Sequence, residues 1–291
     1  MTFTVGIAGI SSRLARLIAN ELLKRPDVRL RGSCRDTAKL PENLRESPRV
    51  SLFQAGPYDT KTLRSLIHGC DAVVCCYAAE DEIMVNGQKL LIDLCEEEGI
   101  TRYIASDYTV DYTKFDWGDL AIKEPMKHIK TYLESKATVK GVHVLVGFLM
   151  ETTLDMNIIY DPKANKIRYW GTGNEKWDLT SYQTAAEYVA AVTLDPNATG
   201  LFKFRGEHKS ALEVAEDVKS VLGTQPDLET RASLDDVALR LDGAGNTQDI
   251  LSAIAYFILS GKVALGNNLD NAKYPDVKPE TFSSVLSRRL K

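Results

Sequence analysis

Residues 2–13 read TFTVGIAGISSR, an apolar run that leads directly into a loop carrying Gly6 and Gly9. Residues 2–7 predict a buried strand, and apolar residues at helical spacing predict a helix over residues 12–24. Glycines between a strand and a helix let the backbone turn tightly and approach a diphosphate, which the free N–H groups of the helix can then bind. This stretch therefore predicts the first strand, loop and helix of a nucleotide-binding α/β fold.

The rest of the first half repeats the same alternation. Further strands are predicted at residues 29–34, 50–54, 72–77, 102–106 and 142–147, with helices at residues 60–66 and 86–98 and another from about residue 125. Apolar strands separated by amphipathic helices are typical of a parallel sheet covered on both faces. We therefore predict a doubly wound α/β fold of the Rossmann type.

The pattern changes after residue 150, which predicts a second structural part. Residues 1–150 form the expected nucleotide-binding domain, and a helix and strand within residues 178–205 are expected to rejoin it. Residues 151–177 and 206–291 then form a smaller, discontinuous C-terminal part. Ligands of open α/β sheets bind at the carboxyl ends of the strands, so we expect this smaller part to bind the substrate there.

Composition narrows the class of protein. The net charge of −4 over 291 residues gives no electrostatic reason to expect binding to nucleic acid or to an anionic membrane. No apolar run approaches the ~20 residues that span a bilayer, and the first residues lack the pattern of a signal peptide. The five cysteines have no zinc-site spacing, so we expect reduced thiols, no metal and a cytoplasmic location.

The loop after the first strand supplies the predicted phosphate site. Gly6 and Gly9 would allow the close backbone approach, Ser11 and Ser12 could add hydroxyl donors, and Arg13 adds positive charge. A plain glycine turn without a ligand is the alternative.

The end of the second predicted strand decides the expected cofactor. An acidic residue there would favour NAD, whereas an arginine accommodates the 2′-phosphate of NADP(H). Arg35 occupies this place and Lys39 follows, although Asp36 lies between them. We therefore predict NADP(H), the alternative being that both basic residues are solvated loop charges.

These features in order resemble the NmrA-like and isoflavone-reductase-like family of atypical short-chain dehydrogenases, in particular its fungal members. The resemblance rests on the glycine loop, on Arg35 and on the segments HGCDAVV (68–74), GITRYIAS (99–106), YWGTGNEKWDLTS (169–181) and NAKYPDVKP (271–279). It implies a Rossmann domain with a small substrate-binding domain, a preference for NADP(H), and small, often aromatic substrates. The chain departs from the family pattern at Ala8, Ser12 and Thr184, where a threonine, a glycine and an acidic residue are usual.

Two lysine arrangements compete as the catalytic group. Tyr132 and Lys136 have the YxxxK spacing of short-chain dehydrogenases, with Ser106 as a third member. Lys136 would lie about 16 Å along the helix from its start near Pro125 at ~1.5 Å per residue. Helix starts face the ligand edge of a parallel sheet, so this pair is expected at the wrong edge.

Lys127, in the first turn of the same helix, is the second arrangement, and the resemblance implies a functional lysine near it; Lys123 is the alternative. Ser106 and Tyr108 follow the fifth strand at the ligand edge. We predict that Ser106 binds the cofactor and that Tyr108 donates a proton or lines the nicotinamide pocket. The alternatives are that Lys127 is a solvated surface lysine and that Tyr108 only packs in the loop.

Phe148, Met150 and Trp170 are the predicted substrate-facing side chains, although core packing would explain Trp170 equally well. Together the features predict an NADPH-dependent reductase of a small aromatic or secondary-metabolite substrate. The alternatives are an NADP(H)-binding redox-sensing regulator without turnover and a redox-silent isomerase or cyclase. A homodimer or a regulatory protein partner is compatible with these functions.

Overall fold

The computed structural model describes residues 2–231 and 250–290, so residues 232–249 of the predicted C-terminal part lie outside it. The chain divides into two compact units. The first unit comprises Met1–Tyr108, Ile122–Val144 and Ala185–Phe202; the second comprises Thr109–Ala121, Leu145–Thr184 and Lys203–Lys291.

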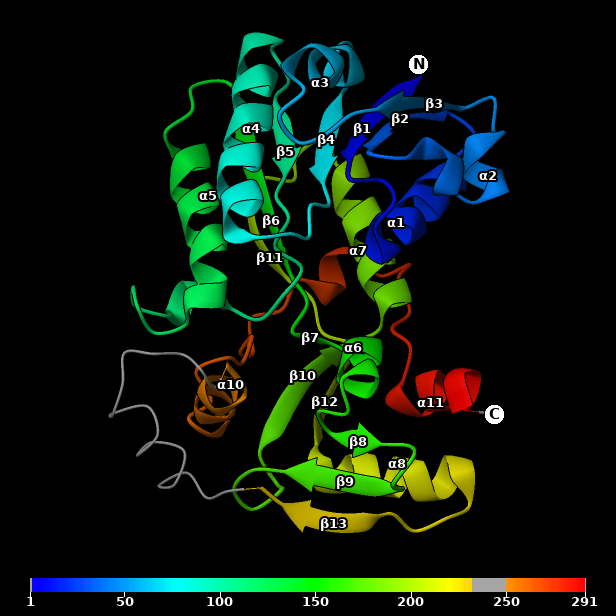
Figure 1. Cartoon of the computed structure of the whole chain (residues 1–291), viewed down its shortest axis with the longest axis vertical. Helices are drawn as coiled ribbons and strands as arrows, with labels where there is room; N and C mark the ends of the chain where they lie inside the picture. The colour runs from blue at the N-terminus through cyan, green and yellow to red at the C-terminus, as the bar shows by residue number, and fades with distance from the viewer. Residues whose placement is uncertain (1, 232–249, 291) are drawn as a thin grey trace. The chain divides into compact units, whose positions relative to one another are not determined.

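A central sheet organises the first unit (Figure 1). β1 (Phe3–Ala8) pairs in parallel with β2 (Val28–Cys34) on one side and with β4 (Ala72–Cys75) on the other. The remaining strands are β3 (Val50–Gln54), β5 (Arg102–Ile104), β6 (Lys140–Leu145) and β11 (Gly200–Lys203). The order β3-β2-β1-β4-β5-β6-β11, with parallel pairing throughout β1 to β6, confirms the predicted doubly wound sheet.

Helices cover both faces of this sheet, with α4 and α5 on one side and α1 and α7 on the other (Figure 1). These helices are α1 (Arg13–Leu23), α2 (Glu42–Arg45), α3 (Thr60–Ile67), α4 (Gln88–Glu97), α5 (Glu124–Glu134) and α7 (Tyr182–Leu194). On one face, Leu91 and Ile92 of α4 and Ile129 of α5 pack in a buried cluster with Val73 and Tyr103 of the sheet. Burial of this apolar surface is the main stabilising contribution to the unit.

The second unit carries two small sheets, with strand orders β12-β10-β7 and β13-β9-β8. Their strands are β7 (Phe148–Leu149), β8 (Tyr160–Asp161), β9 (Lys166–Tyr169), β10 (Lys176–Thr180), β12 (Glu207–Ser210) and β13 (Asp227–Thr230). The helices of this unit are α6 (Met150–Asp155), α8 (Ala211–Leu222), α10 (Ile250–Leu259) and α11 (Phe282–Leu290). Strands of two to five residues carry too little periodicity to stand out in the sequence.

The start of α4 differs from the prediction. A helix beginning at residue 86 was expected, but a π-helical turn, Ile83–Gly87, precedes α4. The buried Gln88 side chain donates to the Met84 carbonyl oxygen at 2.8 Å, which takes over an acceptor of the helical ladder. The Gln88 side-chain oxygen accepts from the Ser106 backbone N–H at 3.1 Å. This residue thus ties the irregular turn to the segment after β5.

All five cysteines are buried and free of disulfides. Within the described residues, no helix is long and apolar enough to cross a membrane. The same part of the chain contains no cluster of three or more metal-ligating His, Cys, Asp or Glu side chains.

Candidate functional site

The first unit contains a cavity of about 370 Å³, within the range of small-molecule sites. It lies at the carboxyl ends of β1 to β4, the edge where open α/β sheets bind ligands. Its lining residues come from the ends of these four strands. They are Gly9, Ser11 and Ser12 after β1; Ser33, Cys34 and Arg35 at the end of β2; Ala55 and Pro57 after β3; and Cys76, Tyr77, Ala78, Ala79, Glu80 and Ile83 after β4.

Gly9 is held in a conformation that requires glycine. Its φ is +80°, and a Cβ there would lie 2.8 Å from the Cys76 carbonyl oxygen. Gly6 lies inside β1 and does not line the cavity; a Cβ on Gly6 would lie 3.3 Å from Cys70 Sγ. Gly9 therefore brings the loop close to the end of β4, and Gly6 permits close packing beneath it.

Ser12 is the N-cap of α1. Its side chain accepts a hydrogen bond from the Ala15 N–H at 3.2 Å, which satisfies one free amide of the first turn. Ser12 thus occupies the position where the resembled family usually has a third glycine, and it caps the helix there. Its hydroxyl hydrogen remains a donor on the wall of the cavity.

The start of α1 favours an anion. Arg13 is the first helical residue and is exposed, Ser11 is exposed beside it, and the first turn carries no acidic residue. Free amides and the positive end of the helix dipole attract phosphate groups. The donors, the glycine turn and the cavity volume fit the diphosphate of a dinucleotide.

The two predicted 2′-phosphate residues lie in different settings. Arg35 is exposed and lines the cavity next to Cys34. Lys39 does not line it; its side chain is 81% exposed, and its Nζ lies 3.3 Å from an Asp36 carboxylate oxygen. Asp36 also accepts from the Ala38 N–H at 3.1 Å. Of these two basic residues, Arg35 alone lines the cavity.

Tyr77 is a cavity residue that the sequence pattern did not single out. Its ring lies 3.3 Å from where a Gly9 Cβ would be, and burial raises the pKa of its phenol. The hydroxyl oxygen is buried without a hydrogen-bond partner among the described residues. Ser106 donates its hydroxyl to the Tyr77 carbonyl oxygen at 2.7 Å, so the predicted cofactor ligand Ser106 holds the chain after β4.

Tyr108 is also held by the sheet. Its hydroxyl donates to the Cys75 carbonyl oxygen at 2.9 Å, and burial raises the pKa of the phenol well above its usual value. Its φ of +42° is rare for a residue with a side chain and marks a strained turn. A phenol that is buried and already donating is a poor proton source at neutral pH.

The two candidate lysines lie one turn apart at the start of α5. Lys127 is in the first turn and Lys123 immediately precedes the helix; both are partly buried. Burial lowers the pKa of Lys123 to about 8, while the negative charge of Asp107 acts in the opposite direction. A lysine that titrates near neutral pH is suited to proton transfer.

Asp107, whose charge acts on Lys123, forms a buried pair with His143. Asp107 Oδ2 lies 2.6 Å from His143 Nδ1, and the two residues are 5% and 3% exposed. This pair was not predicted from the sequence. The available signal was the polar His143 in the otherwise apolar run VHVLV of β6, next to the strand that Asp107 follows.

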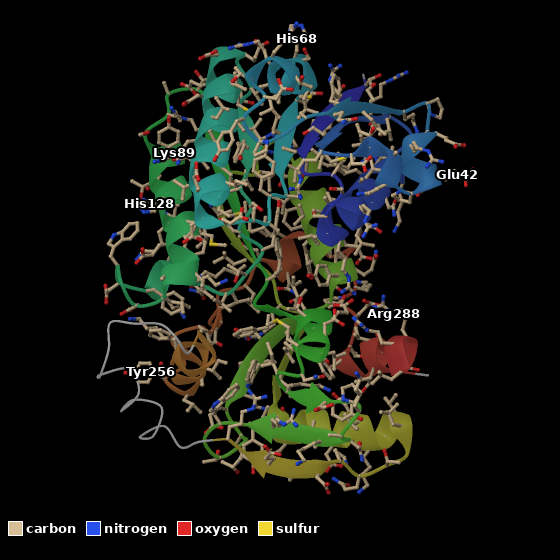
Figure 2. All side chains as sticks on the ribbon, in the orientation of Figure 1. Glu42, His68, Lys89, His128, Tyr256 and Arg288 are labelled. Carbon is tan, nitrogen blue, oxygen red and sulfur yellow. The ribbon has the colours of Figure 1, made fainter. Side chains whose placement is uncertain are left out.

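The Tyr132–Lys136 pair forms a separate network at the other end of α5. Tyr132 donates its hydroxyl to Asp93 of α4 at 2.7 Å, and Lys136 contacts the same carboxylate oxygen at 2.5 Å. Burial and the Asp93 hydrogen bond raise the pKa of Tyr132. Neither residue lines the cavity. Lys89 of α4 and the exposed His128 of α5 mark the same two helices in Figure 2.

The predicted substrate-facing residues belong to the second unit. Phe148 is partly buried, and its ring centroid lies 4.9 Å from that of Trp177. Trp170 stacks on Trp177 at 6.5 Å and Arg231 lies 4.5 Å above the Trp170 ring. Met150 is fully buried at the start of α6. Phe148 is therefore the most accessible of the three predicted side chains.

A family model described as NAD(P)H-binding matches residues 9–196, which include the glycine loop and Arg35. A protein named oxidoreductase nsrR from Aspergillus novofumigatus (strain IBT 16806) is 31% identical over 83 residues. That match spans 28% of this chain and 31% of the relative's length.

Solved structures share the whole fold at low identity. An isoflavone reductase is similar with a TM-score of 0.81 and 19% identity, covering 99% of both chains. AtPrR2, solved with NADP⁺ and (+)-pinoresinol, has a TM-score of 0.79 at 17% identity over 99% of this chain and 98% of its own. Leucoanthocyanidin reductase from Vitis vinifera with NADPH has a TM-score of 0.75 at 15% identity over 98% of both chains. The solved structures show that this chain shares the fold of isoflavone-reductase-like proteins, and the family model confirms the expected pyridine-nucleotide cofactor class.

Proposed function

The chain belongs to the NAD(P)H-binding family, and from this premise we propose that it is an NADPH-dependent reductase of a small aromatic substrate. The observation that carries the proposal is the cavity that Gly9, Ser12 and Arg35 line together at the carboxyl edge of the sheet. The glycine turn and the start of α1 supply a diphosphate site, and Arg35 supplies a cation for a further phosphate.

Arg35 is the basis for preferring NADPH over NADH. Its guanidinium can bind a 2′-phosphate through two parallel hydrogen bonds. Arg35 lines the cavity, whereas Lys39 does not and lies against Asp36. Glu80 lines the same cavity and would repel a phosphate placed against it, so the 2′-phosphate is expected on the β2 side.

When bound, NADPH supplies a hydride, and the reduced product also needs one proton. We assign this proton to Lys123, the lysine that the sequence left as the alternative to Lys127. Lys123 has a pKa lowered to about 8 by burial, so it is largely protonated at pH 7 and its proton is more acidic than that of a solvated lysine. Under this assignment, Lys127 and Tyr108 are not the proton donors.

The aromatic substrate class has two supports. The solved structures above include one with (+)-pinoresinol and others named for isoflavone and leucoanthocyanidin reductases. In the second unit, Phe148 and Trp177 offer aromatic surface, of which Phe148 is partly accessible. Aromatic side chains pack well against flat apolar ligands.

The test is NADPH oxidation measured at 340 nm over a panel of small aromatic enones, imines and benzylic ethers. The proposal expects turnover of at least one compound with NADPH, lost in Lys123→Met and retained in the matched control Lys136→Met. Firm NADPH binding with no turnover on any compound would contradict it and favour a dinucleotide-sensing role.

A further inference from the structure

The side of the cavity after β4 is formed by irregular chain. Residues 76–80 belong to neither a strand nor a helix, and Ile83 is the first residue of the π-turn. These six residues all line the cavity, and we call them the β4 wall. Ala78, Ala79 and Glu80 at its centre are exposed. A segment with so few buried apolar contacts opens easily unless hydrogen bonds fasten it.

Gln88 fastens both ends of the β4 wall. Its side chain is buried, and its Nε2 donates to the Met84 carbonyl oxygen at 2.8 Å, just past the end of the wall. Its Oε1 accepts from the Ser106 N–H at 3.1 Å. Ser106 in turn donates its hydroxyl to the Tyr77 carbonyl oxygen at 2.7 Å, near the start of the wall. A chain of three hydrogen bonds therefore joins the two ends of the wall through one side chain.

The π-turn also packs directly against the cavity residues. A Cβ on Gly87, the last residue of the turn, would lie 3.3 Å from Pro57 Cβ and 3.5 Å from both Ile83 Cγ2 and Tyr77 Cε2. All three of these neighbours line the cavity. A shift of the π-turn would therefore reach the cavity through van der Waals contacts. Turns of this kind are rare and occur frequently at functional sites.

The β4 wall faces the same space as Arg35, because both line one cavity. Arg35 is the proposed ligand of the 2′-phosphate, which NADP(H) carries on its adenosine ribose. A nucleotide bound in this way places its adenosine half against the wall. Ala55, Pro57 and Ile83 add apolar surface that suits a flat base.

We propose that Gln88 is a positioning residue that sets the affinity of the cavity for the adenosine half of NADP(H), by holding the β4 wall in place through Ser106 and the π-turn. The inference rests on the proposed function, because it takes the cavity to be the cofactor site. Gln88 itself does not line the cavity, so its effect passes through the wall.

The chain also offers a matched control. The Tyr103 hydroxyl donates to the same Gln88 Oε1 at 3.3 Å. Tyr103 is fully buried in β5 and does not line the cavity. Tyr103→Phe removes one buried hydrogen bond of Gln88 but leaves the bonds to Met84 and Ser106. It therefore separates a general loss of stability from loss of the fastening.

The first test measures binding of adenosine 2′,5′-bisphosphate by calorimetry. Gln88→Met keeps the length of the side chain and removes both bonds, so we expect its Kd to rise about 10-fold. Ser106→Ala, which breaks the link to Tyr77, should also raise the Kd, and Tyr103→Phe should stay close to the wild type. Adding Ser106→Ala to Gln88→Met should weaken binding little further, because bonds of one chain are not additive.

The second test measures hydrogen exchange of the same proteins without nucleotide. Residues 77–84 should exchange faster in Gln88→Met and Ser106→Ala than in the wild type, while residues 91–97 of α4 stay protected. If Gln88→Met does not fold, Ser106→Ala decides the matter. Unchanged exchange of residues 77–84, an unchanged Kd, or fully additive losses in the double variant would each overturn the inference.

Neither test uses hydride transfer, so the inference and the reductase proposal can fail separately. Absence of turnover, with the expected binding and exchange, would remove the reductase proposal alone. Turnover with NADPH, together with equal Kd values in the wild type and Gln88→Met, would remove the positioning role alone. A folded wild type that does not bind adenosine 2′,5′-bisphosphate would contradict the inference.

Discussion

The two ends of α5 each carry a lysine close to a carboxylate, but only one end lies at the ligand edge of the sheet. At the carboxyl end of the helix, Tyr132 and the following Lys136 share Asp93 of α4 in a partly buried network. Before the helix, Lys123 is partly buried, and the charge of Asp107, which pairs with His143, acts on it. The comparison shows that sequence spacing, here YxxxK, does not define a site unless the sheet topology brings it to the carboxyl ends of the strands.

The largest effect on kcat should come from replacing Lys123 and Lys136 by methionine, one at a time. Lys123→Met removes the proposed proton donor and is expected to lower kcat by about 10²–10⁴-fold, the usual contribution of acid–base catalysis. Lys136→Met breaks a partly buried ion pair with Asp93 whose residues do not line the cavity, and should leave kcat nearly unchanged. Lys127→Met is the third arm. If it lowers kcat more than Lys123→Met does, the assignment between these two lysines is reversed.

The second effect concerns the nucleotide at the same edge. Arg35→Ala is expected to weaken NADPH binding by about 10- to 100-fold, since a charge-assisted hydrogen bond contributes about 1.5–3 kcal/mol. NADH lacks the 2′-phosphate, so its affinity should hardly change. Lys39→Ala is the matched control and should have a smaller effect, because Lys39 does not line the cavity. Equal losses for both nucleotides, measured by fluorescence titration, would remove the argument for NADP(H).

The third effect is a pH dependence. Burial lowers the pKa of Lys123 to about 8, so the protonated fraction falls as the pH rises through that value. If Lys123 donates the proton, kcat should be high near neutral pH and decline through about pH 8. A profile measured at saturating NADPH and substrate checks this. A kcat that rises over the same range would indicate that Lys123 acts as a base.

The smallest effect belongs to the far end of α5. Tyr132→Phe removes the hydrogen bond to Asp93 and should lower the free energy of unfolding by about 0.5–1.5 kcal/mol without changing kcat. Chemical denaturation compared with the wild type measures the loss. A marked fall in kcat in this variant would restore the YxxxK pair as a catalytic candidate.

Much of the first unit was predictable from its sequence. The continuous apolar strands and the glycine loop predicted the parallel sheet, and β3 was predicted to the residue, at Val50–Gln54. Arg35 could be predicted at the ligand edge because it follows directly after a strand that the sequence pattern also predicted. In each case the signal is local, within about ten residues of chain.

The rest depends on contacts between distant residues. Asp107 and His143 are 36 positions apart and meet only because β5 and β6 pair in one register. The π-turn before α4 depends on where the Gln88 side chain lies, which no periodicity encodes. Lys123 could be named as an alternative to Lys127, but its burial could not be read from the sequence.

The central claim is that the glycine loop and Arg35 form an NADP(H) site. Isothermal titration of NADPH and NADH into the folded protein tests it most directly. We predict saturable heat with both nucleotides and a distinctly lower Kd for NADPH. Absence of heat with either nucleotide, on protein shown to be folded, would contradict the account.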